Sequence, residues 1–157
     1  MILAEKTGYE VVNLGQPGRE IPVLDRQFQY LERDIIKAGQ IDALMIMLGT
    51  NDLLNMSRPD VPVVAERMKQ LLIFLRERFS ELFICLLIPP LIRENAVFLQ
   101  ASRQLAEAYR KFQEPGLVDV LDTTKWDLSL AFDGVHISEE SQDKFAENVK
   151  EYFERKK

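Results

Sequence analysis

Hydrophobic and polar residues follow two different patterns along the chain. Short apolar runs without polar interruption, such as residues 44–48 and 82–88, are typical of strands buried on both faces of a sheet. Between these runs, apolar residues recur every three or four positions, as in a helix with one buried face. The patterns predict strands at 9–14, 41–48, 82–88 and 117–121, alternating with helices at 24–38, 63–79, 94–113 and 138–155.

This alternation predicts parallel strands joined by right-handed crossovers, and therefore a three-layer α/β/α sandwich. Pro59 and Pro62 are expected to delay the start of the second helix until about residue 63. Residues 1–6, followed by Thr7 and Gly8, predict the last turn of an additional helix. The sequence has no internal repeat, low-complexity segment or linker, so we expect residues 1–157 to form a single domain.

The composition and net charge exclude some classes of partner and cellular location. Hydrophobic residues make up 46% of the 157 residues, and the formal net charge of −5 argues against a nucleic-acid partner or an anionic membrane surface. No apolar run is long enough to span a bilayer and no signal peptide is present, which favours a cytoplasmic protein and leaves open a secretion signal upstream of Met1. Cys85 is the only cysteine and lies in an apolar run, so we expect a buried, inert thiol and no Cys/His metal cluster.

Polar residues follow two of the predicted strands directly. The run 44–48 ends at Gly49-Thr50-Asn51-Asp52, and ligands of parallel sheets bind just beyond the carboxyl ends of the strands. Asn51 would offer amide N–H donors there, although a turn that caps the next helix explains the same residues equally well. The loop 15–20 carries Gly15 and Gly18, which indicate positive φ, a close backbone approach or a plain surface turn.

The only histidine, His136, also follows a predicted strand. Asp133 stands three residues before it, with Gly134 between them to let the chain fold back. A carboxylate in that position can accept the Nδ1 proton and leave Nε2 free as a base, although a lone histidine is more often structural or merely exposed. Two amide donors and an oriented base are what acyl transfer requires, because the donors stabilise an oxyanion while the base accepts the proton of the nucleophile.

Three segments in this order resemble the SGNH hydrolases, a family also called GDSL lipases and esterases. Asn13-Leu14-Gly15-Gln16-Pro17-Gly18 is similar to the family's second block, Gly49-Thr50-Asn51-Asp52 to the third, and Asp133-Gly134-Val135-His136 to the fifth. The resemblance covers essentially the whole chain. It implies a flavodoxin-like parallel sheet, with Gly18 and Asn51 as oxyanion donors, His136 as the base and Asp133 as its partner. It further implies hydrolysis of esters or thioesters without a metal or an organic cofactor.

The chain departs from the family at the first block, a Gly-Asp-Ser motif that carries the nucleophilic serine. No such motif occurs here, and every serine lies in a loop after another element or in a helix: Ser57, Ser80, Ser102, Ser129, Ser138 and Ser141. The strand before that block is the central one of the 2-1-3-4-5 order, so its absence would leave neighbouring strands unpaired. We therefore expect an N-terminally truncated chain, a strand lent by another copy or a partner, or direct closure of the strands at 9–14 and 41–48.

The leading hypothesis is a carboxylic ester hydrolase acting on small acyl esters, with a serine outside this sequence. The alternative is a catalytically inactive SGNH-like protein that binds an ester, a sugar or a partner. A flavodoxin-like binding or signalling domain, unrelated to hydrolases, is a third reading that leaves the coincidence of Asn51, Asp133 and His136 unexplained. The expected partners are a small ester substrate and a second chain, which would be either another copy in a homo-oligomer or a partner that donates a strand.

Overall fold

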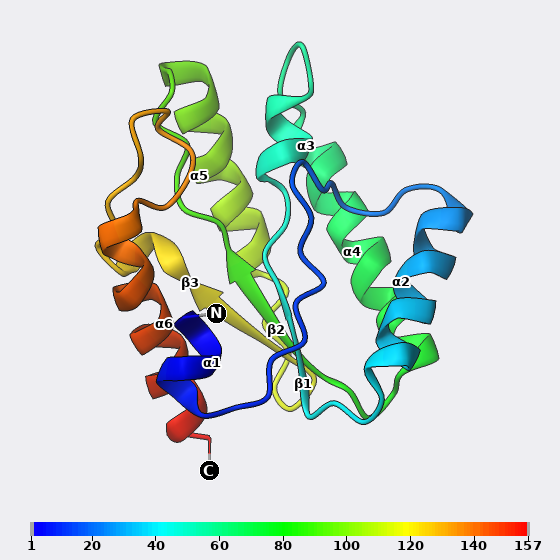
Figure 1. Ribbon diagram of the computed structural model, residues 1–157. Helices are drawn as coiled ribbons and strands as arrows, with labels where there is room; N and C mark the ends of the chain where they lie inside the picture. Colours follow the sequence, from blue (N-terminus) through cyan, green and yellow to red (C-terminus); the bar gives the residue numbers. More distant parts are fainter. Residues whose placement is uncertain (1, 157) are drawn as a thin grey trace.

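A parallel sheet forms the centre of the molecule in the computed structural model, which describes residues 2–156 (Figure 1). Within these residues the sheet has three strands, in the spatial order β1-β2-β3: β1 (Ala43–Ile46), β2 (Phe83–Ile88) and β3 (Val118–Asp122). Cys85 of the middle strand lies beside Met45 on one side and beside Asp119 on the other. Because all pairings are parallel, the carboxyl ends of the strands meet at one edge.

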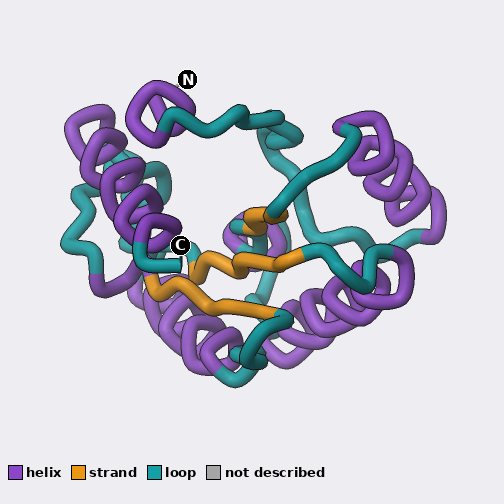
Figure 2. The backbone as a smooth tube through the Cα atoms, turned by 90° about the horizontal axis from the view of Figure 1, so that it is seen from below, coloured by secondary structure: helices purple, strands orange, loops and turns teal. Residues whose placement is uncertain are grey.

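Helices cover both faces of the sheet (Figures 1 and 2). α4 and α5 lie on one face with α2 beside α4, whereas α6 and α1 lie on the other. Among residues 2–156, no helix is both long and apolar enough to cross a membrane. The helical elements are α1 (Ile2–Thr7), α2 (Asp25–Ala38), α3 (Thr50–Leu54), α4 (Val61–Arg78), α5 (Ala96–Arg110), the 3-10 turn η1 (Thr123–Lys125) and α6 (Glu139–Glu154).

The middle strand divides the core into two clusters, because successive side chains of a strand point to opposite faces. One face of β2 packs with residues of α4 and α5, and the other face packs with residues of α6. The β2 side chains in the first cluster are Ile84, Leu86 and Ile88, and those in the second are Cys85 and Leu87. Cys85 is fully buried, as expected, and this burial raises the pKa of its thiol to about 12.

The predicted helices are present, with small shifts at their ends. α4 begins at Val61 rather than at about residue 63, because a proline is tolerated in the first turn, where its missing N–H has no helical partner. The Asp60 side chain caps this helix by accepting a hydrogen bond from the Val63 N–H at 3.1 Å. The short helix expected before Gly8 is α1, apart from Met1, which lies outside the described residues.

The prediction of a strand at 9–14 is wrong, because this segment is irregular in the structure. The expectation that the strands at 9–14 and 41–48 close up directly is wrong for the same reason, since β1 pairs only with β2 within residues 2–156. β1 is also shorter than predicted and is not buried on both faces: three of its four residues are only half-buried, and Met47 just after it is 42% exposed. A strand at the edge of a sheet lacks the second neighbour that would cover it.

Candidate active site

Asp133 and His136 form a hydrogen-bonded pair in the loop that precedes α6. The Nδ1 atom of His136 lies 2.7 Å from Oδ2 of Asp133. The other carboxylate oxygen accepts hydrogen bonds from the backbone N–H groups of Val135 at 2.9 Å and of His136 at 3.0 Å. These bonds, led by the one from the His136 ring, lower the pKa of Asp133 to about 2. The carboxylate is therefore ionised near neutral pH and holds the proton on Nδ1.

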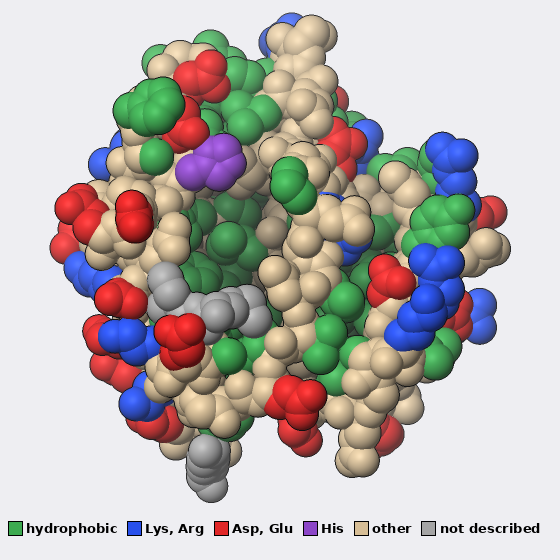
Figure 3. Space-filling view, viewed as in Figure 1, with side chains coloured by type: hydrophobic (Ala, Val, Ile, Leu, Met, Phe, Trp, Pro, Cys, Tyr) green, Lys and Arg blue, Asp and Glu red, His purple; other side chains and the backbone are tan. Residues whose placement is uncertain are grey.

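The second ring nitrogen of His136 is open to solvent. The side chain is 79% exposed, and no hydrogen bond from residues 2–156 occupies Nε2. In Figure 3 the single histidine lies at the rim of a surface hollow whose inner wall is apolar. In the neutral ring with its proton on Nδ1, the lone pair lies on Nε2 at the solvent side, which is the form a general base requires.

Gly134 allows the loop to dock on the segment that follows β2. Its φ is +67°, and a Cβ there would lie 2.9 Å from the backbone of both Arg93 and Glu94. The Arg93 N–H donates to the Gly134 carbonyl at 2.7 Å, and the Ala131 N–H donates to the His136 carbonyl, also at 2.7 Å. Loops that follow β2 and β3 are thus joined at the carboxyl edge of the sheet, where parallel α/β proteins bind their ligands.

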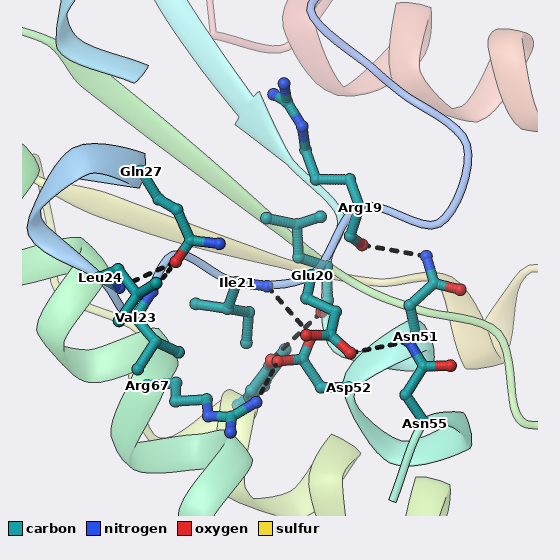
Figure 4. Close-up of polar contacts among 12 residues, drawn as sticks. Arg19, Glu20, Ile21, Val23, Leu24, Gln27, Asn51, Asp52, Asn55 and Arg67 are labelled. Atoms are coloured by element: carbon teal, nitrogen blue, oxygen red, sulfur yellow. Dashed lines mark hydrogen bonds and ion pairs between the residues drawn. The ribbon is translucent and has the colours of Figure 1, made fainter. Parts of the chain in front are cut away.

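Asn51 lies in the first turn of α3, directly after β1. Its Nδ2 donates a hydrogen bond to the backbone carbonyl of Arg19 at 2.9 Å, as Figure 4 shows. The side chain of Arg19 points away from Asn51 in this view. Because a primary amide has two N–H groups, one remains available after this contact. α3 begins at Thr50 and no side chain caps it, so the turn reading holds only in that a short helix follows the strand. Asn51 keeps a second N–H, which is the donor that the functional reading needs.

Gly18 is the residue immediately before Arg19. It has φ of +70°, as a glycine in a tight turn does, and a hydrogen bond of 3.2 Å from the Arg19 N–H to the Gln16 carbonyl closes the turn. Gly15 is not in the positive-φ region; its backbone lies instead against the Asn13 side chain, which accepts its N–H at 2.9 Å. The contact between Asn51 and Arg19 brings the Gly18 turn next to α3.

The four residues identified in the sequence therefore form two local pairs. Asp133 and His136 are in direct contact, and Gly18 lies beside the residue that Asn51 contacts. Figure 1 shows that the loop before α6 and the Gly18 segment with α3 lie at the same end of the molecule, toward which the strands point. Along the sequence, Asp133 lies 82 positions after Asn51 and 115 positions after Gly18.

Several of the described serines make hydrogen bonds away from His136. The Ser102 hydroxyl accepts from the Ile92 N–H at 3.1 Å and donates to Leu99. Ser129 joins the hydroxyls of Ser138 and Ser141 at 2.7 and 2.8 Å. No hydrogen bond within residues 2–156 connects a serine to His136.

Sequence reasoning missed a buried carboxylate beside Asn51. Asp52 is 0% exposed, and its oxygens accept from the Ile21 N–H at 3.1 Å and from Arg67 at 3.0 Å. Burial raises the pKa of Asp52, against the opposing effect of these two hydrogen bonds. The one signal in the sequence was the acidic residue within Gly49-Thr50-Asn51-Asp52; no pattern pointed to Arg67. Among residues 2–156, no cluster of three or more His, Cys, Asp or Glu is arranged to hold a metal ion.

A parallel sheet with a carboxylate–imidazole pair at its carboxyl edge is typical of hydrolytic enzymes of the α/β class. Residues 1–144 match the sequence profile of the GDSL-like lipase/acylhydrolase family, so the chain belongs to this family. This result confirms the resemblance to SGNH hydrolases found in the sequence. No curated protein sequence matches the chain significantly.

Solved esterase structures share the fold. The native aryl esterase of M. smegmatis is 21% identical, with 98% of this chain and 83% of that chain aligned and a TM-score of 0.82. Est24, a carbohydrate acetylesterase from Sinorhizobium meliloti, is 18% identical, with the same coverages and a TM-score of 0.82. A carbohydrate esterase family 3 protein from Talaromyces cellulolyticus is 16% identical, with 88% and 68% aligned and a TM-score of 0.60. These similarities confirm the α/β fold class, with helices on both faces of a parallel sheet.

Proposed function

We propose that this chain provides the acid–base pair and the oxyanion donors of a carboxylic ester hydrolase acting on small acyl esters. The observation that carries the proposal is the contact of 2.7 Å between Nδ1 of His136 and Asp133, with Nε2 open beside an apolar hollow. Membership of a lipase and acylhydrolase family supports hydrolysis as the reaction. The names of the structural neighbours, an aryl esterase and a carbohydrate acetylesterase, favour small acyl groups such as acetate.

In the proposed reaction the nucleophile is a serine hydroxyl from outside the 157 residues. His136 Nε2 takes the hydroxyl proton while the serine oxygen bonds to the acyl carbon. The carbonyl oxygen becomes an oxyanion, and the Gly18 N–H and the free N–H of Asn51 donate hydrogen bonds to it. Collapse of this intermediate breaks the ester C–O bond, and the proton on Nε2 passes to the departing alkoxide.

A water molecule then attacks the acyl-serine with His136 again as the base. Collapse of this second tetrahedral intermediate releases the carboxylic acid and returns the proton to the serine. Asp133 stays ionised throughout, because its role is to hold the ring and to stabilise the imidazolium that forms. A serine for this cycle would come from residues that the codons upstream of Met1 encode, or from a strand lent by a second copy or a partner.

The test is hydrolysis of an aryl acetate by a chain extended with the residues encoded upstream of Met1. We expect His136→Ala to lower kcat by about 10²–10⁴-fold, because general base catalysis is lost. Asn51→Ala should lower it by about 10²–10³-fold, the usual effect of removing one oxyanion donor. Phe132→Ala is the matched control, since Phe132 lies in the same loop and is fully exposed. Hydrolysis that persists in His136→Ala, or an upstream sequence without a serine, would count against the proposal.

A second function, an inactive relative that binds an ester or a sugar, is favoured by the serine positions described above. It predicts that the 157-residue chain binds an acetylated ligand in a calorimetric titration without a burst of released phenol from an aryl acetate. Acyl transfer from the aryl acetate to the chain itself would exclude this reading.

A further inference from the structure

The segment of Arg19, Glu20 and Ile21, here called the donor segment because it follows Gly18, is attached to α3 at three points. The Arg19 carbonyl accepts from Asn51 at 2.9 Å, the Glu20 carboxylate accepts from Asn55 at 2.7 Å, and the Ile21 N–H donates to Asp52 at 3.1 Å. Figure 4 shows all three contacts side by side. The segment belongs to no strand or helix, so no ladder of backbone hydrogen bonds fixes it.

The contact to Asp52 differs from the other two in its burial. Asp52 and Ile21 are both 0% exposed, whereas the bond between Asn55 and Glu20 is at the surface. A buried carboxylate is costly unless it is paired, and Arg67 supplies the pairing charge from α4 at 3.0 Å. The bond to Ile21 is therefore charge-assisted and screened from water, the conditions under which a hydrogen bond holds its geometry best.

Both oxygens of Asp52 are used, one by each donor. Oδ2 accepts from the Ile21 N–H, and Oδ1 accepts from Nη1 of Arg67. An asparagine at this position would have a single acceptor oxygen for two donors, the buried Ile21 N–H and the half-buried Arg67 guanidinium, so one of the two contacts would be lost. The arrangement thus ties the donor segment to α3, which carries Asn51, and to α4, an 18-residue helix that packs in the core.

We propose that Asp52, held by Arg67, is a positioning residue that fixes the donor segment against α3, so that the Gly18 N–H and the Asn51 amide converge on one oxyanion. The inference rests on the proposed function, because convergence matters only for acyl transfer. Asp52 itself touches no substrate, since it is completely buried. Its effect reaches the reaction through Ile21 and the two residues between Ile21 and Gly18.

The first test needs no catalysis and uses the 157-residue chain. Amide hydrogen exchange is compared between the wild type, Asp52→Asn and the control Glu66→Gln. The control changes an exposed carboxylate next to Arg67 in the sequence, and the Glu66 carboxylate accepts its hydrogen bond from Gln70. We expect the Ile21 amide to exchange about tenfold faster or more in Asp52→Asn, with a smaller change in β2 and none in the control. An Ile21 amide that exchanges as in the wild type, or only as much faster as the amides of β2, would overturn the proposal.

The second test uses the aryl acetate assay described above. Asp52→Asn should lower kcat by about 10²-fold with little change in KM, because a misplaced donor weakens transition-state binding only. Arg67→Lys should recover part of the activity lost in Arg67→Met, since an ammonium restores the charge but not the planar geometry of the guanidinium. A rise in KM with unchanged kcat, or equal activity of the two Arg67 variants, would contradict the positioning role. If neither the wild type nor any variant hydrolyses the ester, the proposed function fails, while the exchange data still decide whether Asp52 fixes the segment.

Discussion

The sharpest prediction for stability concerns Gly49, which links β1 to the helix that carries Asn51. Its φ is +119°, a conformation that residues with a Cβ rarely adopt. A Cβ there would lie 2.7 Å from the hydroxyl oxygen of Tyr109 and 2.9 Å from a methyl carbon of Leu105. Tyr109 is fully buried and its hydroxyl donates to the Leu48 carbonyl at 3.2 Å, so it has no open space into which to move. Gly49→Ala therefore meets both backbone strain and a steric clash.

The magnitude follows from these two costs. Backbone strain at positive φ costs about 1–3 kcal/mol for a residue other than glycine. Overpacking a filled core adds about 1–3 kcal/mol. We expect Gly49→Ala to lower the free energy of unfolding by about 4 kcal/mol, a large share of the stability of a domain of this size. The corresponding fall in Tm is about 10 °C.

Urea denaturation followed by circular dichroism measures this free energy directly. Gly116→Ala is the matched control, because Gly116 has φ of +77° and no atom within 4 Å of an added Cβ, so only backbone strain applies. In the double variant Gly49→Ala/Tyr109→Phe, loss of the hydroxyl removes the closest clash, and the loss should be smaller than the sum of the single variants by about 1 kcal/mol. A Gly49→Ala loss no larger than that of Gly116→Ala, or strict additivity in the cycle, would refute the reasoning.

Three further substitutions test other parts of the fold. Leu53→Ala should cost about 2–5 kcal/mol in urea denaturation, because Leu53 is 0% exposed, and a loss below about 1 kcal/mol would contradict this. Burial alone would raise the pKa of Asp119, but hydrogen bonds led by the one from Lys156 lower it below the usual 3.8. The ionised Asp119 carboxylate therefore stabilises the folded state above pH 3.8, and this contribution is lost as the pH falls below that value. The urea midpoints of the wild type and Asp119→Asn should differ near neutral pH and converge as the pH falls well below 3.8. Thr123→Val should cost about 1–3 kcal/mol, because the Thr123 hydroxyl donates to the buried Ile88 carbonyl at 2.6 Å, and Thr123→Ser should retain most of the stability.

The sequence predicts best the elements whose pattern and burial agree. The run at 82–88 is the middle strand β2, so its continuous apolar character corresponds to burial on both faces. The run at 44–48 looks the same in the sequence, yet β1 lies at the edge and Met47 is 42% exposed. A run of apolar residues indicates that a strand is suited to burial, whereas its position at the centre or the edge of the sheet depends on which strands pair with it. The segment at 9–14 shows the same limit, because β-branched residues form a strand only where another strand can pair with them.

In the candidate site, contacts between residues close in the sequence were predictable, whereas contacts between distant residues were not. Asp133 and His136 are three residues apart with a glycine between them, so the spacing alone allows the observed hydrogen bond of 2.7 Å. The contact of Asn51 with the Arg19 carbonyl spans 32 positions, and the sequence did not predict it. The strand expected at 9–14, whose end would have placed the Gly18 loop beside Asn51, is absent from the structure. Arg67 had no such guide, because an arginine on a helix is usually solvated and nothing in its neighbourhood marks it as the partner of a buried acid. Candidate site residues can be proposed from the end of a strand, whereas the residues that hold them in position become visible only when the helices are packed.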